Sequence, residues 1–134
     1  MIATLITSMK NYDLVICGYR RISSQGRQVD VAWPTAEAHD YKDFLHVFNR
    51  LYSVGLINSP CNKIYLAELI KGHKLRFDRS INLGEDLLFN LSYLRLCHSI
   101  QLIPEVLYNY FTSPPTSLSK SREKGPFLQP TDAV

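Results

Sequence analysis

The sequence of 134 residues has no long apolar run and few cysteines. No stretch approaches the roughly 18 consecutive apolar residues of a transmembrane helix, and the N-terminus lacks the form of a signal peptide. The three cysteines, Cys17, Cys61 and Cys97, are an odd number and lie far apart, which indicates free thiols in a reducing compartment. We therefore expect a cytoplasmic protein, either soluble or bound peripherally to the inner face of the membrane.

The chain also lacks a strong excess of either charge. Its formal net charge is +3 and its pI is about 8.8, which suits an anionic substrate or a membrane surface but does not require a nucleic acid. Arg20, Arg21 and Arg27 form a small basic cluster, yet basic and aromatic residues are not interleaved as in nucleic-acid-binding motifs. We predict that these arginines are solvated surface charges and that nucleic acid is not a partner.

Motifs that bind nucleotides or metals are missing as well. The sequence contains no Asp-x-Asp motif, no P-loop and no Gly-x-Gly-x-x-Gly fingerprint. His39, Asp43 and His46 have the spacing of metal ligands on a helix, but no cysteine or further carboxylate completes a set. The sequence therefore predicts no metal site and no cofactor in this chain.

The hydrophobic content of 46% is that of a globular protein, and its pattern alternates between helical and strand periodicity. This predicts an α/β domain in which a short mixed sheet is flanked by three to four helices. The expected helices are 2–10, 40–53 with Asp40 as its cap, 67–72 and 84–98; the expected strands are 13–19, an edge strand at 27–33, 100–103 and 105–111, the last two separated by Pro104.

Two adjacent carboxylates, Glu85 and Asp86, stand at the expected start of the central helix. Asn82 is placed to serve as the N-cap, with Glu85 completing a capping box three residues later. The positive end of the helix dipole favours anionic side chains in the first turn. If Glu85 turns back to cap the helix, Asp86 faces outward from its end.

Beyond the acidic pair, leucines recur at helical spacing and predict the buried face of the central helix. The predicted stripe consists of Leu87, Leu91 and Leu94, widened by Leu88 and Cys97.

A second polar segment, Asn-Lys-Ile-Tyr at residues 62–65, follows Pro60. Lys63 offers a point charge and Asn62 offers both a donor and an acceptor, so the pair is suited to contact a phosphate or a sugar. Two alternatives remain open at this stage: the pair binds substrate, or Asn62 caps backbone groups while Lys63 pairs with Glu85 or Asp86.

These segments occur in a fixed order: residues 58–65, Leu-Arg-Phe-Asp at 75–78, the acidic segment 83–91, Leu-Tyr-Asn-Tyr at 107–110 and Ser-Leu-Ser at 117–119. The chain resembles, over about residues 1–119, the C-terminal half of a bacterial family-2 inverting glycosyltransferase with a GT-A fold. It departs from that family at Cys61, where a tryptophan is frequent, and at Phe111, where an arginine is frequent.

The resemblance implies roles for individual residues. Asp86 would be the general base, Glu85 would orient the acceptor or brace the loop, and Gly84 would let the backbone approach a sugar. Asn62 and Lys63 would contact substrate. In the complete enzyme, the family's partners are a nucleotide sugar and a glycan or lipid-linked acceptor, its cofactor is Mg²⁺ or Mn²⁺, and its products are cell-envelope polysaccharides.

The same resemblance leads us to expect that the nucleotide-binding half is lacking and that this chain alone has little or no transferase activity. A missing half would leave apolar faces and a sheet edge exposed, so we expect a homo-oligomer. Residues 120–134 are polar and predict a disordered tail. The alternative function is a small non-catalytic α/β interaction module that oligomerises, in which the acidic pair only caps a helix.

Overall fold

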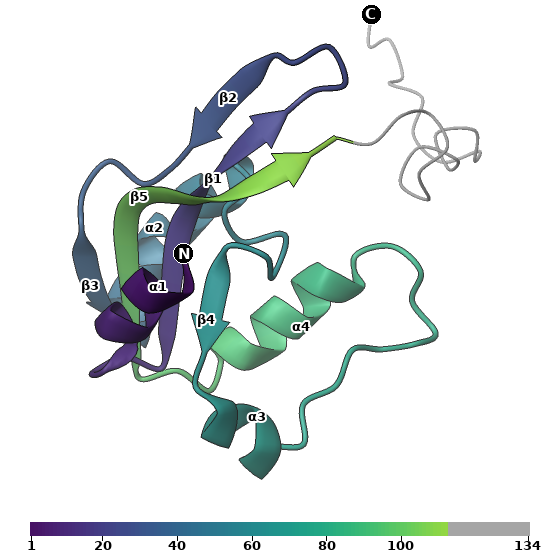
Figure 1. Ribbon diagram of the computed structural model, residues 1–134. Helices are drawn as coiled ribbons and strands as arrows, with labels where there is room; N and C mark the ends of the chain where they lie inside the picture. The colour runs from purple at the N-terminus through teal and green to yellow at the C-terminus, as the bar shows by residue number, and fades with distance from the viewer. Residues whose placement is uncertain (113–134) are drawn as a thin grey trace, which may run out of the picture.

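The computed structural model describes residues 1–112, and they form a mixed α/β fold of four helices and a five-stranded curled sheet (Figure 1). The predictions for the tail at 120–134 and for a domain boundary at 119 lie outside these residues. The elements in chain order are α1 (Ile2–Met9), β1 (Leu14–Ile22), β2 (Gln28–Val31), β3 (Glu37–Asp40), α2 (Tyr41–Ser53), β4 (Lys63–Tyr65), α3 (Ala67–Gly72), α4 (Glu85–Leu94) and β5 (Ser99–Phe111).

Strand β1 is the centre of the sheet. It runs parallel to β5 along most of its length, and its other edge is shared by two antiparallel strands. The first half of β1 pairs with β4, and the second half pairs with β2. Strand β3 is antiparallel to β5 and lies outside it. The first strand and the last strand of the described chain are therefore direct neighbours.

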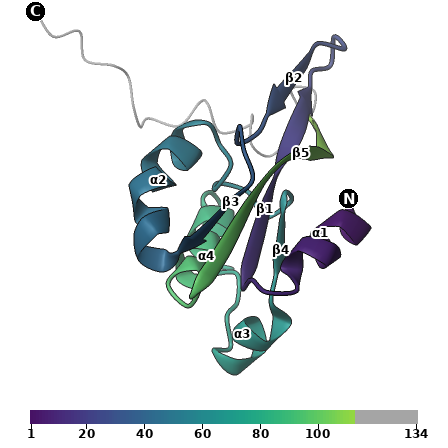
Figure 2. The same ribbon diagram turned by 90° about the vertical axis from the view of Figure 1, so that its left-hand side faces the viewer.

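The helices cover the two faces of the sheet unequally, as Figure 2 shows: α2 and α4 lie on one face and α1 on the other. The larger core contains side chains from both helices and the sheet, among them Phe44, Leu51, Tyr93 and Leu102. The smaller core lies under α1 and consists of Leu5, Val15, Cys17 and Ile103. Alternate residues of β1 enter the two cores, as expected for a strand buried on both faces.

Several sequence-based predictions are confirmed. Helix α1, strand β1, the hairpin of β1 with β2 and helix α3 all form where the pattern placed them. Helix α2 begins after Asp40, whose carboxylate accepts a hydrogen bond of 2.8 Å from the backbone N–H of Asp43. All three cysteines are free thiols. None of the four helices in residues 1–112 has the length and apolar character needed to cross a membrane.

The predicted cap of α4 was wrong. The N-cap residue is Gly84 rather than Asn82, and no side-chain hydrogen bond caps this helix, so Glu85 does not complete a capping box. Gly84 has a φ of 91°, a left-handed conformation that glycine adopts without a steric penalty. The helix also ends at Leu94 instead of 98, because the carboxylate of Asp13 accepts hydrogen bonds from the backbone N–H groups of His98 and Ser99 and turns the chain into β5.

The predicted apolar stripe on α4 is confirmed at Leu94 and Cys97, which are buried, and at Leu87, which packs against the core, but it was wrong at two other leucines. The buried residues of this helix are Phe89, Asn90, Tyr93 and Leu94. Leu88 and Leu91 are 42% and 36% exposed. Burying the two aromatic rings removes more apolar area from water than burying leucines would, and this decides the orientation of the helix.

Residues 99–111 form one strand, not two. Between the Ile16–Leu102 and Gly18–Val106 pairs, β5 has three residues where β1 has one, so the chain forms a bulge around Pro104. A bulge is a position where proline's missing N–H is tolerated. Strand β3, at 37–40, was not predicted; its four residues are polar or small and take their strand form from pairing with β5.

Candidate functional site

The predicted acidic pair forms the first turn of α4. Glu85 and Asp86 are both partly buried, directly after the exposed Gly84. Burial raises the pKa of Asp86 above its usual value, and the negative charge of Glu85 adds to the rise, while the positive charge of Lys63 opposes it. Asp86 is therefore a stronger base than an ordinary surface aspartate.

Helix α4 is fixed next to the acidic pair by Asn90, which lies one turn after Asp86 on the same side of the helix. The Asn90 side chain is 1% exposed. Its Nδ2 donates to the carbonyl of Ile57 at 2.6 Å, and its Oδ1 accepts from the hydroxyl of Tyr65 at 2.6 Å. These bonds join α4 to the loop 54–61 and to β4.

Tyr93 fixes the other end of α4. Its hydroxyl donates to the carbonyl of Asp13 at 2.6 Å and accepts from the backbone N–H of Leu66 at 2.8 Å. The ring of Tyr65 lies edge-on between Phe89 and Tyr93, at centroid distances of 5.8 Å and 4.8 Å. The direction of α4, and with it the position of Asp86, is thus determined by buried polar and aromatic contacts in the second half of the helix.

Asn62 is a structural residue of the loop that leads into β4. It is 1% exposed. Its Nδ2 donates to the carbonyls of Cys17 and Leu56, at 2.9 Å and 3.2 Å. The alternative in which Asn62 caps backbone groups is therefore confirmed.

Lys63 is only 8% exposed, and its amine binds three oxygen atoms. Nζ donates to the carbonyls of Leu56 at 2.6 Å and Ser59 at 2.5 Å, and to Asn62 Oδ1 at 2.8 Å. These three acceptors match the three donors of an ammonium group. Burial nevertheless lowers the pKa of Lys63 to about 7.

Lys63 does not form the ion pair with the acidic helix start that one alternative predicted. Within residues 1–112, no salt bridge joins it to Glu85 or Asp86. The two groups influence each other only through space, since the charge of Asp86 raises the pKa of Lys63. Lys63 and Asn62 therefore shape the loop 54–61 behind the acidic pair.

A cleft of about 390 Å³ opens on the other side of Asn62. It lies at the carboxyl ends of the parallel strands β1 and β5 and is closed by the loop 54–61; we call it the β1–β5 cleft. The residues that give it its chemical character are Tyr19, Arg21, Asn58, Ser59, Tyr110 and Thr112. In open α/β sheets, ligands bind in the crevice outside the carboxyl ends of the strands.

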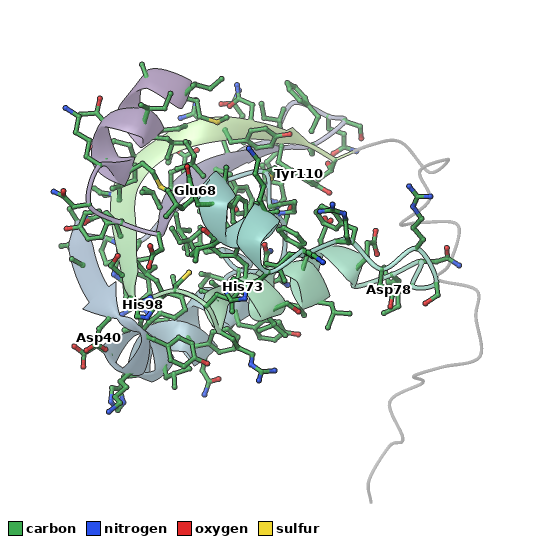
Figure 3. The ribbon with its side chains drawn as sticks, turned by 90° about the horizontal axis from the view of Figure 1, so that it is seen from below. Asp40, Glu68, His73, Asp78, His98 and Tyr110 are labelled. Atoms are coloured by element: carbon green, nitrogen blue, oxygen red, sulfur yellow. The ribbon has the colours of Figure 1, made fainter. Side chains whose placement is uncertain are left out.

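Figure 3 shows which labelled side chains lie toward the same end of the molecule. Tyr110, at the end of β5, and Asp78, on the loop before α4, lie toward one end of the molecule, and Asp40 and His98 lie toward the other. The start of α4 and the carboxyl ends of β1 and β5 share the first of these ends (Figure 1). The helix turn that carries the acidic pair and the strand ends that line the cleft therefore lie toward the same end of the molecule.

The sequence-predicted residues are brought together in part. Gly84 is exposed and Glu85 and Asp86 beside it are partly buried, while Asn62 and Lys63 are buried. Sequence reasoning missed Asn90, although its spacing of four residues from Asp86 was a usable signal. Sequence reasoning also missed the cleft. The cleft is formed only when β1 pairs with β5, and this pairing joins residues about 90 positions apart.

Residues 1–112 contain no group of three or more His, Cys, Asp or Glu side chains arranged to hold a metal ion. His39 instead lies 3.2 Å from the carboxylate of Glu37. No chemical step is therefore assigned to a metal bound by these residues.

Comparison with known proteins gives no family assignment: no protein-family model matches the chain, and no curated protein sequence matches it.

Proposed function

We propose that this chain is the acceptor-side part of an inverting glycosyltransferase of the GT-A type, with Asp86 as the general base. The order of the sequence motifs supports this, as does the position of Asp86 on the first turn of a firmly held helix. The natural role of such an enzyme is the synthesis of a cell-envelope polysaccharide from a nucleotide sugar and a glycan or lipid-linked acceptor.

In the proposed reaction, Asp86 accepts the proton of an acceptor hydroxyl. The hydroxyl oxygen forms a bond to the anomeric carbon of the donor sugar, and the bond from that carbon to the diphosphate oxygen breaks on the opposite face. The bonding electrons leave with the diphosphate. Binding of the nucleotide is not assigned to any residue of this chain.

The observation that carries the proposal is the environment of Asp86. A general base is most effective when its pKa lies near the working pH, and burial moves the pKa of Asp86 in that direction. The carboxylate is held by a helix whose Asn90 and Tyr93 are locked by hydrogen bonds. Glu85 would orient the acceptor, and Gly84, without a side chain, leaves room for a sugar.

The roles of Asn62 and Lys63 in this proposal are indirect. Their polar atoms are occupied by loop carbonyls and by each other. They therefore support the loop 54–61, and the charge of Lys63, where the amine is protonated, opposes the rise in the pKa of Asp86.

The test is a transfer assay on the chain expressed with a nucleotide-binding half of the same family, over a panel of nucleotide sugars with Mg²⁺ or Mn²⁺. Asp86→Asn keeps the size of the side chain and removes the base, so we expect the rate to fall by about a hundredfold or more. Asp43→Asn is the matched control, because Asp43 is also an acidic residue in a first helical turn. Full activity of Asp86→Asn would contradict the proposal.

The second candidate is the non-catalytic interaction module. One observation favours it: α2 and α4 leave an apolar groove between them, lined by Leu45, Phe48 and Leu91 among others. Leu45 is 51% exposed. For this function, a second copy of the chain would cover the groove.

A further inference from the structure

The β1–β5 cleft has the size and position of a ligand site. Its volume of about 390 Å³ lies within the range of about 300–1,000 Å³ that is typical of small-molecule pockets. Gly55 makes its shape possible: φ is +85°, and a Cβ at this position would lie 2.9 Å from the hydroxyl of Tyr19. A side chain at this position would be strained by the positive φ and would displace the tyrosine hydroxyl.

Two aromatic rings form one wall of the cleft. Tyr19 and Tyr110 pack edge to face with their centroids 6.3 Å apart. Tyr110 remains 42% exposed, so part of its ring is available to a ligand. The C–H-rich face of a pyranose ring packs on an aromatic ring while its hydroxyl groups contact polar neighbours, and tyrosine offers both an apolar ring and a hydroxyl.

Arg21 provides the charge of the cleft. It is the one charged residue among those lining the cleft within the described part of the chain, and no carboxylate there forms an ion pair with it. Its neighbour Arg20 is instead bound by both carboxylate oxygens of Asp30, at 2.7 Å and 3.0 Å. A guanidinium group matches the geometry of a carboxylate or a phosphate.

The polar floor and rim have different roles. Asn62 lines the floor, but its amide is engaged by Cys17 and Leu56. Asn58 lies on the rim, and its exposed side chain makes no hydrogen bond to residues 1–112. The cleft thus offers an aromatic surface, one cation and an available amide.

We propose that the β1–β5 cleft binds a saccharide that carries an anionic group, with the sugar ring on Tyr110 and the anion on Arg21. The choice of a saccharide rests on the proposed function; the anionic group follows from the lining itself. The acceptor of the enzyme would then be an acidic glycan. The cleft and Asp86 are linked through the loop 54–61 and β4: Asn62 lines the cleft and accepts a hydrogen bond from Lys63, whose charge acts on Asp86.

Titrations of the full chain followed by ¹H–¹⁵N NMR test this proposal. The probes are methyl glucuronide, glucose 6-phosphate, methyl glucoside and inorganic phosphate. We expect the two acidic sugars to shift the amide signals of Asn58 and Tyr110 and to bind more tightly than the neutral glucoside or phosphate alone. The stronger of the two acidic sugars identifies the anion as a carboxylate or a phosphate.

Variants separate the contributions. Arg21→Gln should weaken binding of the acidic sugars about tenfold, as expected for the loss of one charge-assisted contact. Arg27→Gln removes the same charge from an exposed position outside the cleft and should leave affinity unchanged. Tyr110→Ala should weaken binding of the sugars but not of inorganic phosphate.

Three results would overturn the proposal. The first is that neither acidic sugar shifts the amide signals of cleft residues, and the second is that neutral and acidic sugars bind with the same affinity. The third is that Arg21→Gln binds the acidic sugars as tightly as the wild type does. If inorganic phosphate bound as tightly as glucose 6-phosphate, the sugar ring would contribute nothing, and the assignment of the ligand as a saccharide would be wrong. Binding is measured without turnover, so it does not require any residue to act as a base. Failure here is therefore distinct from failure of Asp86 as a base.

Discussion

Lys63 combines two opposing effects in one side chain. Removal from water disfavours its charged form and lowers the pKa to about 7. Its three oxygen acceptors favour the ammonium and fix the loop 54–61. The residue therefore fixes the loop 54–61 and makes the stability of the folded protein depend on pH.

The pH dependence has a definite sign. The pKa of Lys63 is about 7 in the folded state and 10.5 in a solvated chain, so the unfolded state binds more protons between these values. The free energy of unfolding should rise with pH from about 7 to 9.0 by about 1 kcal/mol per pH unit. Above 9.0 the buried thiol of Cys97, with its pKa raised to about 12, acts in the opposite direction.

Urea denaturation across this range measures the slope, and Lys63→Met should remove it. Lys71→Met, at an exposed position in the last turn of α3, is the matched control and should keep the slope. A wild-type slope equal to that of Lys63→Met would show that the amine stays charged in the folded state.

At the level of single residues, one local capping signal was reliable, a second one failed, and contacts between distant residues were not visible in the sequence. The cap at Asp40 was predictable because its partner lies three residues away. The position of Asn62 was ambiguous because its partner Cys17 is 45 residues distant. The cap at Asn82 failed because the left-handed Gly84 starts the helix two residues later.

Among the elements, β1 depends on close approach to the chain that follows β2. A Cβ at Gly18 would lie 2.7 Å from the Cβ of Ala32 and 2.9 Å from the carbonyl oxygen of Val31. Gly18 also lies where the register of β1 against β5 shifts. The absence of a side chain is therefore a condition for this part of the sheet.

Gly18→Ala should destabilise the fold by about 1–3 kcal/mol, because the methyl group overpacks the interior. Gly72→Ala is the control: a Cβ there meets no atom within 4 Å, and alanine favours the helix. Denaturant unfolding of both variants measures the difference. Equal stability of the two variants would contradict this account of β1.

Periodicity predicted where most elements lie but not how they pack. Helix α4 is apolar on more than one side, so its sequence could not show that Phe89 and Tyr93, rather than Leu88 and Leu91, face the core. Strand β5 continues through Pro104 because its pairing with β1 absorbs a bulge. Strand β3 has no apolar alternation and exists through β5 alone.

The molecule as a whole exposes apolar surface on both sides of the sheet. On α2, Leu45 and Tyr52 are 51% and 46% exposed; on α1, Ile2 and Ile6 are 66% and 55% exposed. Such surfaces are candidates for contacts between protein chains. The α/β class follows from the sequence pattern, whereas the GT-A assignment depends on the motif resemblance and stays a proposal.

Light scattering tests the predicted self-association. We expect the measured mass to exceed the 15.4 kDa of one chain and to increase with concentration. Leu45→Lys should restore the monomer if the groove between α2 and α4 is the interface, and Ile2→Lys, on the opposite face, should not. A mass of 15.4 kDa at every concentration would contradict both the oligomer and the interaction module.

The parallel pairing of β1 with β5 has a consequence for when the sheet can form during translation. Asp13, at the start of β1, binds Ser99, at the start of β5, across 86 residues. At translation rates of about 5–20 residues per second, the apolar β1 leaves the ribosome several seconds before its main partner exists. Until β5 has been made, the apolar residues of β1 lack their main partner, so the nascent chain carries this edge of β1 unpaired.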